Sequence, residues 1–298
     1  MNTQLRNPGT DGEVPLTEAE FARIARIAKA GWGLSLESAK RPLIRSRLGR
    51  RLKVLGLPGF DAYCDIVESG DAQECDHFVS ALTTNVTHFY REVHHFDLLE
   101  KEVLPGLLER ARKGERIRMW SAGCSTGQEP YSLAASILAQ SRDAARYDLR
   151  ILATDIDTAV LKTAQEGLYD PKICIFPTPE HEARIFGDRP SDAASARPGQ
   201  RPVRPELKQL ITFRRLNLVQ PWPFTGRFDI IFCRNVVIYF DKPTQMQVWT
   251  RFAELLNPGA HLLIGHSERI TAPADVGLVT AGITAYRRQG PIAATARK

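Results

Sequence analysis

The segment SAGCSTGQEP, Ser121 to Pro130, places a serine, two glycines and a carboxylate in a spacing that fits two kinds of chemistry. Gly123 to Gly127 reads G-x-S-x-G, which is typical of the turn that carries the nucleophilic serine of hydrolases. The same glycines are also typical of a turn that holds a cofactor at the end of a strand. Ser125 is therefore either a nucleophile or one residue of a binding loop.

A serine hydrolase needs an acid and then a histidine downstream of its nucleophile. Asp155 or Asp229 with His261 or His266 would have to fill these roles. The sequence has no HGGG oxyanion segment of the lipase type. Its glycine turn also follows the first strand of the pattern, whereas the nucleophile turn lies in the middle of a hydrolase sheet. The hydrolase is therefore the less favoured interpretation.

A nucleoside cofactor fits the same region better. Asp155 ends the next expected strand, 28 residues after Gly127, where a carboxylate is placed to accept hydrogen bonds from both ribose hydroxyls. Neither G-x-G-x-x-G nor Gly-Lys-Ser/Thr is present, so a pyrophosphate is not indicated. Glu129 favours a cationic ligand and opposes phosphate. S-adenosylmethionine has a nucleoside and no phosphate, and it fits these residues.

Parallel strands are needed to position these side chains, and the chain after Arg116 alternates short apolar strands with helices. Polar residues follow the apolar strands at SAGCSTGQE, TDID, NL, CRN and GHSE. This alternation predicts right-handed βαβ units and a mostly parallel sheet with ligands at its carboxyl ends. Seven prolines interrupt the pattern between residues 171 and 205, which indicates a loop-rich insertion or a disordered linker.

The first 80 residues predict a small all-α domain. Thr17 and Glu20 have capping-box spacing before a segment of helical periodicity. A second helix begins near Pro42, and seven basic residues with no acidic one lie from Lys40 to Lys53. Because this helix has one apolar stripe for packing, several of its charges are expected to face solvent.

Composition favours an ordinary globular protein, with 43% hydrophobic and 25% charged residues and a net charge of +6. The sequence shows neither a signal-peptide core nor an apolar run of the roughly 18 residues that span a bilayer. Its five cysteines are typical of reduced thiols, so we expect a cytoplasmic location. No metal site is predicted, and His94 and His95 are expected on a helix surface.

Several segments closely resemble the CheR family of chemotaxis protein-glutamate O-methyltransferases. These are TTNVTHFYREVHHF, WSAGCSTGQEPYSLA, ATDIDTAVL, FDIIFCRNVVIYFD and GHSE. The resemblance extends from about residue 16 to 288. It implies a Rossmann-like S-adenosylmethionine-dependent methyltransferase domain of the α/β class, with a small inserted subdomain and a preceding all-α domain. Expected boundaries are a tail at 1–15, a helical domain at 16–82, a linker lining the active site at 83–96, a methyltransferase domain at 97–290 with an insertion at about 171–206, and a tail at 291–298.

By this resemblance, Arg91 and Tyr239 are the candidates for orienting the substrate carboxylate, and Ser125 becomes a turn residue. Expected cofactor contacts are Asn85, Thr87, Arg91, Gly123, Glu129, Asp155, Asn217, Leu218, Arg234 and Asn235. The basic helix is expected to dock the substrate through Arg41, Arg45, Arg47, Arg50 and Arg51.

The family methylates glutamates in the cytoplasmic helical bundle of chemoreceptors, so this bundle is the expected partner. Some members also bind a C-terminal tether peptide of the receptor at the inserted subdomain. This sequence departs from the family there because residues 171–206 are rich in proline. The basic charge leaves a nucleic-acid methyltransferase as an alternative, but the chain has CRNVVIYF where such enzymes carry D/N-P-P-Y. We therefore expect no nucleic acid, and no membrane insertion.

Overall fold

The computed structural model describes residues 14–187 and 199–290. The chain divides into two compact units, Met1–Thr84 and Asn85–Lys298. The expected tails at 1–15 and 291–298 lie almost wholly outside the described residues. Among the residues that the structure describes, no helix is both long and apolar enough to cross a membrane.

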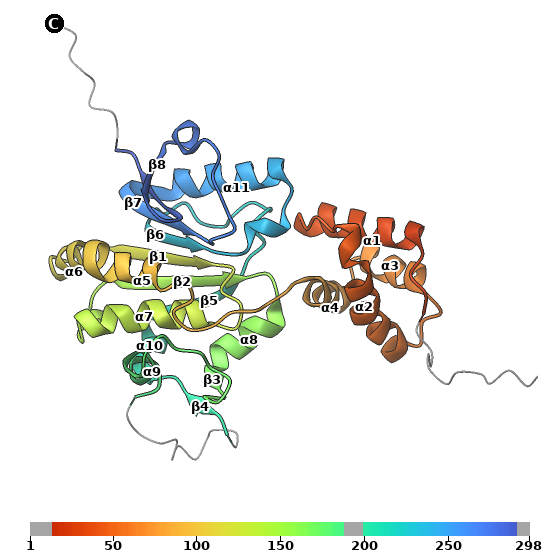
Figure 1. Cartoon of the computed structure of the whole chain (residues 1–298), viewed down its shortest axis with the longest axis horizontal. Coiled ribbons are helices and arrows are strands. Elements are labelled where there is room, and N and C mark those ends of the chain that lie inside the picture. The colour runs from red at the N-terminus through yellow and green to blue at the C-terminus, as the bar shows by residue number, and fades with distance from the viewer. Residues whose placement is uncertain (1–13, 188–198, 291–298) are drawn as a thin grey trace, which may run out of the picture. The chain divides into compact units, whose positions relative to one another are not determined.

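The N-terminal unit is all-helical, as the sequence predicts (Figure 1). Its helices are α1 (Glu18–Trp32), the 3-10 turn η1 (Ser38–Lys40), α2 (Arg41–Leu55), α3 (Phe60–Glu68) and α4 (Ala72–Leu82). The expected capping box begins α1, since Thr17 Oγ1 accepts from Glu20 N at 3.2 Å and Glu20 Oε2 accepts from Thr17 N at 2.8 Å. Gly56, with φ 66°, ends α2 in the left-handed conformation that glycine adopts readily.

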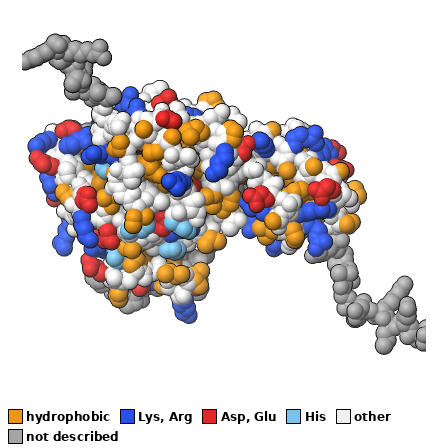
Figure 2. Space-filling view, turned by 45° about the horizontal axis from the view of Figure 1, so that its top comes forward, with side chains coloured by type: hydrophobic (Ala, Val, Ile, Leu, Met, Phe, Trp, Pro, Cys, Tyr) orange, Lys and Arg blue, Asp and Glu red, His pale blue; other side chains and the backbone are white. Residues whose placement is uncertain are grey.

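The arginines of α2 divide into two groups. Arg41 binds Glu18 at 2.6 Å, Arg47 donates to the carbonyl of Thr83 at 2.6 Å, and Arg51 pairs with the buried Glu74. Arg45 and Arg50 are exposed. The first group therefore helps to hold the helices of this unit together, and the second faces solvent. Figure 2 shows Lys and Arg side chains with Asp and Glu among them on this unit's surface.

The second unit contains a seven-stranded sheet in the order β5-β2-β1-β6-β7-β9-β8. The first five strands in this order run parallel, and β9 and β8 continue the sheet antiparallel. The strands are β1 (Ile117–Ala122), β2 (Leu149–Asp155), β5 (Ile211–Arg215), β6 (Phe228–Cys233), β7 (Leu256–Ile264), β8 (Leu278–Gly282) and β9 (Ala285–Arg288). The predicted mostly parallel α/β sheet is thus confirmed.

Helices cover both faces of this sheet (Figure 1). On one face, Ile117 and Met119 of β1 belong to a core shared with α6 and α7. On the other face, Trp120 contacts Phe252 of α11, with ring centroids 5.1 Å apart. The helical elements are α5 (His94–Leu98), η2 (Leu99–Val103), α6 (Leu104–Arg112), α7 (Gln128–Gln140), η3 (Ala144–Arg146), α8 (Thr158–Glu166), η4 (Val237–Tyr239), α11 (Lys242–Leu255) and η5 (Pro273–Val276).

The expected insertion forms a small subdomain around a two-stranded antiparallel sheet of β3 (Leu168–Tyr169) and β4 (Arg201–Pro202). It also contains α9 (Pro179–Phe186) and α10 (Pro205–Leu210), and residues 188–198 lie outside the described part. Phe89 packs against this subdomain, with its ring centroid 4.9 Å from that of Phe176 and 5.2 Å from that of Tyr169. The segment that begins the second unit is therefore fixed to the insertion.

Candidate functional site

The glycine turn between β1 and α7 has three residues in the left-handed conformation, Gly123 (φ 81°), Ser125 (φ 50°) and Gly127 (φ 99°). A Cβ at Gly123 would lie 2.2 Å from Cγ2 of Val236, and one at Gly127 would lie 2.9 Å from Cβ of Ala164. Neighbouring protein side chains thus fill the space beside both glycines, so packing within the chain already requires glycine at each position.

Ser125 is held as a turn residue. Its backbone N–H donates to Oδ2 of Asp155 at 2.7 Å, and its hydroxyl lies 3.0 Å from the carbonyl oxygen of Asn85, to which it donates. A backbone carbonyl cannot take up the proton that a serine nucleophile must lose, so this contact does not activate the hydroxyl. The geometry favours the binding loop over the nucleophile.

Asp155 ends β2 and faces the glycine turn, as its position in the sequence predicts. Its carboxylate also accepts from the backbone N–H of Asp157 at 3.0 Å, and its side chain is largely buried. Burial raises the pKa of Asp155 to about 6, although the N–H groups of Asp157 and Ser125 oppose this shift. Leu216 N donates to the backbone carbonyl of Asp155 at 2.9 Å, which brings the segment with Asn217 and Leu218 to the same edge.

A buried network joins β1, α7 and the end of β6. Arg234 follows β6, and its Nε donates to Oε2 of Glu129 at 2.8 Å, while Oε1 of Glu129 accepts from the hydroxyl of Ser121 at 2.6 Å. Nη1 of Arg234 donates to the carbonyl of Arg91. The negative charge of Glu129 is thus already balanced by Arg234. A ligand ammonium group would bind the remaining lone pairs of this carboxylate.

Two members of the network were not foreseen from the sequence, Glu92 and His95. Oε2 of Glu92 lies 3.8 Å from Nη1 of Arg234, and Oε1 of Glu92 lies 2.8 Å from Nδ1 of His266. Burial would raise the pKa of Glu92, but bonds from His266 and the charge of Arg234 hold it below its usual value. The position of Glu92, in a polar segment before a helix, gave no signal that its side chain would be only 9% exposed.

The expectation that His95 lies on a helix surface is wrong, because this side chain is fully buried. Its Nε2 lies 3.2 Å from the carbonyl oxygen of Ile283, so Nε2 carries the proton and Nδ1 accepts from Arg234 at 3.2 Å. Burial and the charge of Arg234 lower the pKa of His95 to about 3. His95 is therefore a neutral acceptor at neutral pH.

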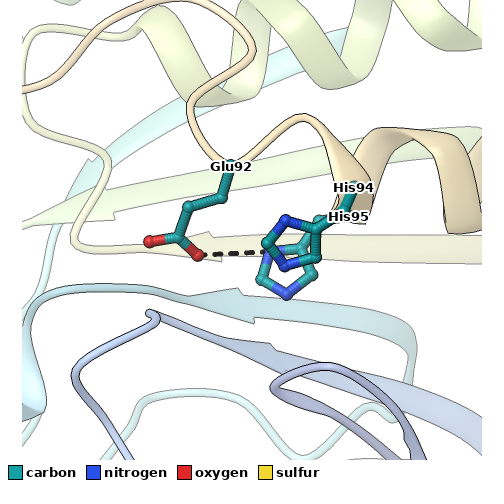
Figure 3. A group of neighbouring side chains, drawn as sticks. All are labelled: Glu92, His94 and His95. Atoms are coloured by element: carbon teal, nitrogen blue, oxygen red, sulfur yellow. Dashed lines mark ion pairs between the residues drawn. The ribbon is translucent and has the colours of Figure 1, made fainter.

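Glu92, His94 and His95 place possible metal-ligand atoms within 4.8 Å of one another (Figure 3). However, Nη1 of Arg234 lies 3.2 Å from Nδ1 of His95 and 3.8 Å from Oε2 of Glu92. A metal ion bound there would be repelled by this charge at short range. Arg234 thus already places a positive charge beside this cluster, and the arrangement favours an internal ion pair over a metal centre.

The remaining candidates lie on the same unit. Asn85 donates to Asp157 at 2.8 Å, and Arg91 donates to the carbonyl of Val86 at 3.0 Å. Thr87 and Tyr239 are half-buried. Asn235, with φ 59°, follows Arg234 in the left-handed conformation, which asparagine adopts more readily than most residues. Oδ1 of Asn235 is buried and has no hydrogen-bond partner among the described residues, which leaves this acceptor available to a ligand donor.

The order of the parallel strands reverses at β1, and the glycine turn and Asp155 lie at this switch point, where α/β sheets bind their ligands. The comparisons agree: the CheR methyltransferase SAM binding domain matches residues 85–282, and the CheR methyltransferase all-alpha domain matches residues 19–83. The unit is therefore a methyltransferase domain that binds S-adenosylmethionine. The chain belongs to the CheR family of chemotaxis protein methyltransferases.

Curated relatives match over nearly their whole length. The chain is 48% identical over 256 residues to a probable chemotaxis protein methyltransferase of Rhizobium etli, a match that covers 86% of this chain and 94% of the relative. It is 40% identical to the chemotaxis protein methyltransferase of Escherichia coli over 260 residues, or 86% of each chain. A relative from Borreliella burgdorferi is 37% identical over 86% of this chain and 90% of its own length.

Proposed function

We propose that this protein transfers the methyl group of S-adenosylmethionine to glutamate side chains in the cytoplasmic helical bundle of chemoreceptors, within the cytoplasm. The main support is that both CheR domains match in order along one chain. The structure adds a carboxylate, Asp155, facing the glycine turn at the switch point of the sheet. The proposed product is a glutamate methyl ester.

The residues at this edge fit S-adenosylmethionine chemically. Asp155 offers a carboxylate to the ribose hydroxyls, and Asn217 with Leu218 would lie on the adenine side. Glu129 and Arg234 with Asn235 would surround the amino acid part, and Asn85, Thr87 and Arg91 would close the site from the segment before α5. When bound, the cofactor supplies an electrophilic methyl group on a positively charged sulfur.

The protein does not need a general base for this reaction. A glutamate side chain is already ionised at pH 7, so its oxygen can attack directly. The task of the protein is then to hold the carboxylate in line with the methyl group and to exclude water. Arg91 and Tyr239 are the proposed orienting residues. Too tight an ion pair with Arg91 would make the carboxylate less nucleophilic, so Arg91 is assigned a positioning role.

The test of this proposal is methyl transfer to a purified cytoplasmic receptor fragment with methyl-labelled cofactor. We expect label in the fragment that alkali releases as methanol, because esters hydrolyse in base and N-methyl groups do not. A fragment in which the accepting glutamates are replaced by alanine is the control and should take up no label. Label that withstands alkali, or label found in nucleic acid instead, would contradict the proposal and favour the nucleic-acid alternative.

Docking of the receptor is assigned to the exposed face of α2. Because Arg41, Arg47 and Arg51 hold their own unit together, charge reversal there would test folding and not docking. We expect Arg45→Glu with Arg50→Glu to raise the receptor KM on the order of tenfold, because attraction to glutamate-rich helices is lost. The measurement is initial methylation rate against receptor concentration.

The matched control for docking is Lys101→Glu with Arg146→Glu, which makes the same change in net charge at two exposed sites of the other unit. This control should leave the receptor KM near the wild-type value. Cofactor affinity should be unchanged in both variants. The wild-type rate at low receptor concentration should also fall with added salt, since exposed charges are screened over about 8 Å at physiological ionic strength. Equal KM values in the two double variants would make α2 a scaffold only.

A receptor tether peptide is assigned to the inserted subdomain. Its support is that Ile173 and Ile175, within this insertion, expose 79% and 66% of their surface. Exposed large apolar side chains beside a short two-stranded sheet suit an extended peptide that adds a strand to the sheet edge.

A further inference from the structure

The carboxylate of Glu268, in the GHSE segment after β7, is buried and surrounded by backbone N–H groups. Oε1 accepts from Val236 at 3.0 Å and from Val237 at 2.8 Å. Oε2 accepts from Asn235 at 2.9 Å and from Gly265 at 2.6 Å. One side chain thus binds three consecutive residues of the segment that follows Arg234. This segment, residues 235–237, is called the β6 loop below.

The β6 loop carries two residues of the proposed site. Asn235 has φ 59°, in the left-handed region that asparagine enters more readily than most residues with a side chain. The carbonyl of Val236 accepts from the backbone N–H of Tyr239 at 3.2 Å, which begins the 3-10 turn η4. The bonds from Glu268 therefore act at the start of the turn that presents Tyr239.

Steric contacts fix the same loop from two further sides. A Cβ at Gly265 would lie 2.6 Å from the backbone nitrogen of Asn235, so only glycine fits beside the β6 loop. Val236 fills the space next to Gly123 in the cofactor turn. A shift of the β6 loop would therefore be transmitted to the cofactor turn as well as to Asn235 and Tyr239.

We propose that Glu268 is a positioning residue for methyl transfer, which sets Asn235 against the cofactor and Tyr239 against the substrate by binding the β6 loop. This inference rests on the proposed function. In this proposal Glu268 contacts neither the cofactor nor the substrate. It fixes the positions of Asn235 and Tyr239, which do. Both of its oxygens must be acceptors, because four N–H donors share them.

Glu268→Gln tests this requirement. The amide keeps the size of the side chain but replaces one acceptor with an NH2 group, which cannot accept from the N–H groups that face it. We expect kcat to fall by at least about tenfold and the affinity for S-adenosylhomocysteine to fall by a similar factor, since 1.4 kcal/mol corresponds to tenfold. Methylation of the receptor fragment gives kcat, and calorimetry gives the affinity.

Asp229→Asn is the matched control. Asp229 is a buried carboxylate that also accepts three bonds, from Arg118 N at 2.9 Å, Arg110 at 3.0 Å and Asn257 at 3.2 Å. It lies at the opposite end of β6 from the β6 loop. This variant should lower the melting temperature while kcat and cofactor affinity stay near wild type. If Glu268→Gln behaves in the same way, the role of Glu268 is structural only and the proposal is overturned.

Gly265→Ala tests the same loop without changing any charge. Its Cβ would push against Asn235, so we expect the same joint loss of kcat and cofactor affinity. Normal values for this variant would overturn the proposal even where Glu268→Gln fails to fold. If the wild-type protein binds S-adenosylhomocysteine but methylates no receptor glutamate, the proposed function fails. The affinity measurements on the two variants then still decide whether Glu268 positions the loop.

Discussion

Replacing Arg234 with methionine is expected to cost about 3–5 kcal/mol of folding free energy and to remove measurable cofactor binding. The guanidinium is 2% exposed and lies between Glu129 and Glu92. Removing it leaves the buried Glu129, and the mostly enclosed side chain of Glu92, without this positive partner, which is the costly way to break a buried ion pair. The carbonyl of Arg91 also loses its donor, so the segment that closes the site loses one of its anchors.

Urea unfolding and calorimetry with S-adenosylhomocysteine measure the two effects of Arg234→Met. Adding Glu129→Gln to this variant should restore part of the stability, because one unpaired charge disappears, but not the cofactor affinity. Arg227→Met is the control, since Arg227 donates to two backbone carbonyls, those of Glu254 and Leu256. We expect it to cost about 1 kcal/mol or less. Equal stability of Arg234→Met and Arg227→Met would disprove the importance of the buried network.

Asp155→Ala is expected to weaken the binding of S-adenosylhomocysteine by about 10- to 100-fold while the fold survives. The variant loses the charge-assisted hydrogen bonds to the ribose hydroxyls, which contribute about 1.5–3 kcal/mol. Calorimetric titration at pH 7.5 measures this loss. Asp71→Ala, which removes a carboxylate bond to Glu74 N in the other unit, is the control and should bind like the wild type.

The dependence of affinity on pH provides a second test of Asp155. Its pKa is raised to about 6, mainly by burial. The ionised carboxylate is the better acceptor for ribose hydroxyls, so cofactor binding favours the deprotonated form. Affinity should therefore be fully present well above pH 6 and should decline as the pH falls through this value. Asp155→Ala should lack this decline, and an unchanged affinity at pH 7.5 would remove Asp155 from the site.

Local sequence signals located much of the fold. The capping box of Thr17 and Glu20 begins α1 where the spacing predicts, because both partners lie within one helical turn. Apolar strands followed by polar residues placed Asp155 and Arg234 at the carboxyl edge of the sheet. Hydrophobic periodicity, helix caps and strand ends depend on residues that are neighbours in sequence. The folded chain therefore keeps these features with little change.

Long-range partners were not predictable in this way. His95 was expected on a surface and is buried, because Arg234 and Ile283, distant along the chain, surround it. The sequence also did not show that Val236 would fill the space beside Gly123. A pattern shows which residues are polar or small, but not which distant side chain will lie against them.

The sequence by itself determined the class of the protein, its all-α and α/β parts and the polar residues at the carboxyl ends of the strands, because these follow from local pattern and family motifs. Only the tertiary structure decided that Glu129 pairs with Arg234 across 105 positions, and that Glu268 binds a loop some 30 residues earlier. The physical reason is that a buried charge is stable only with a partner, and the packing of the sheet selects that partner.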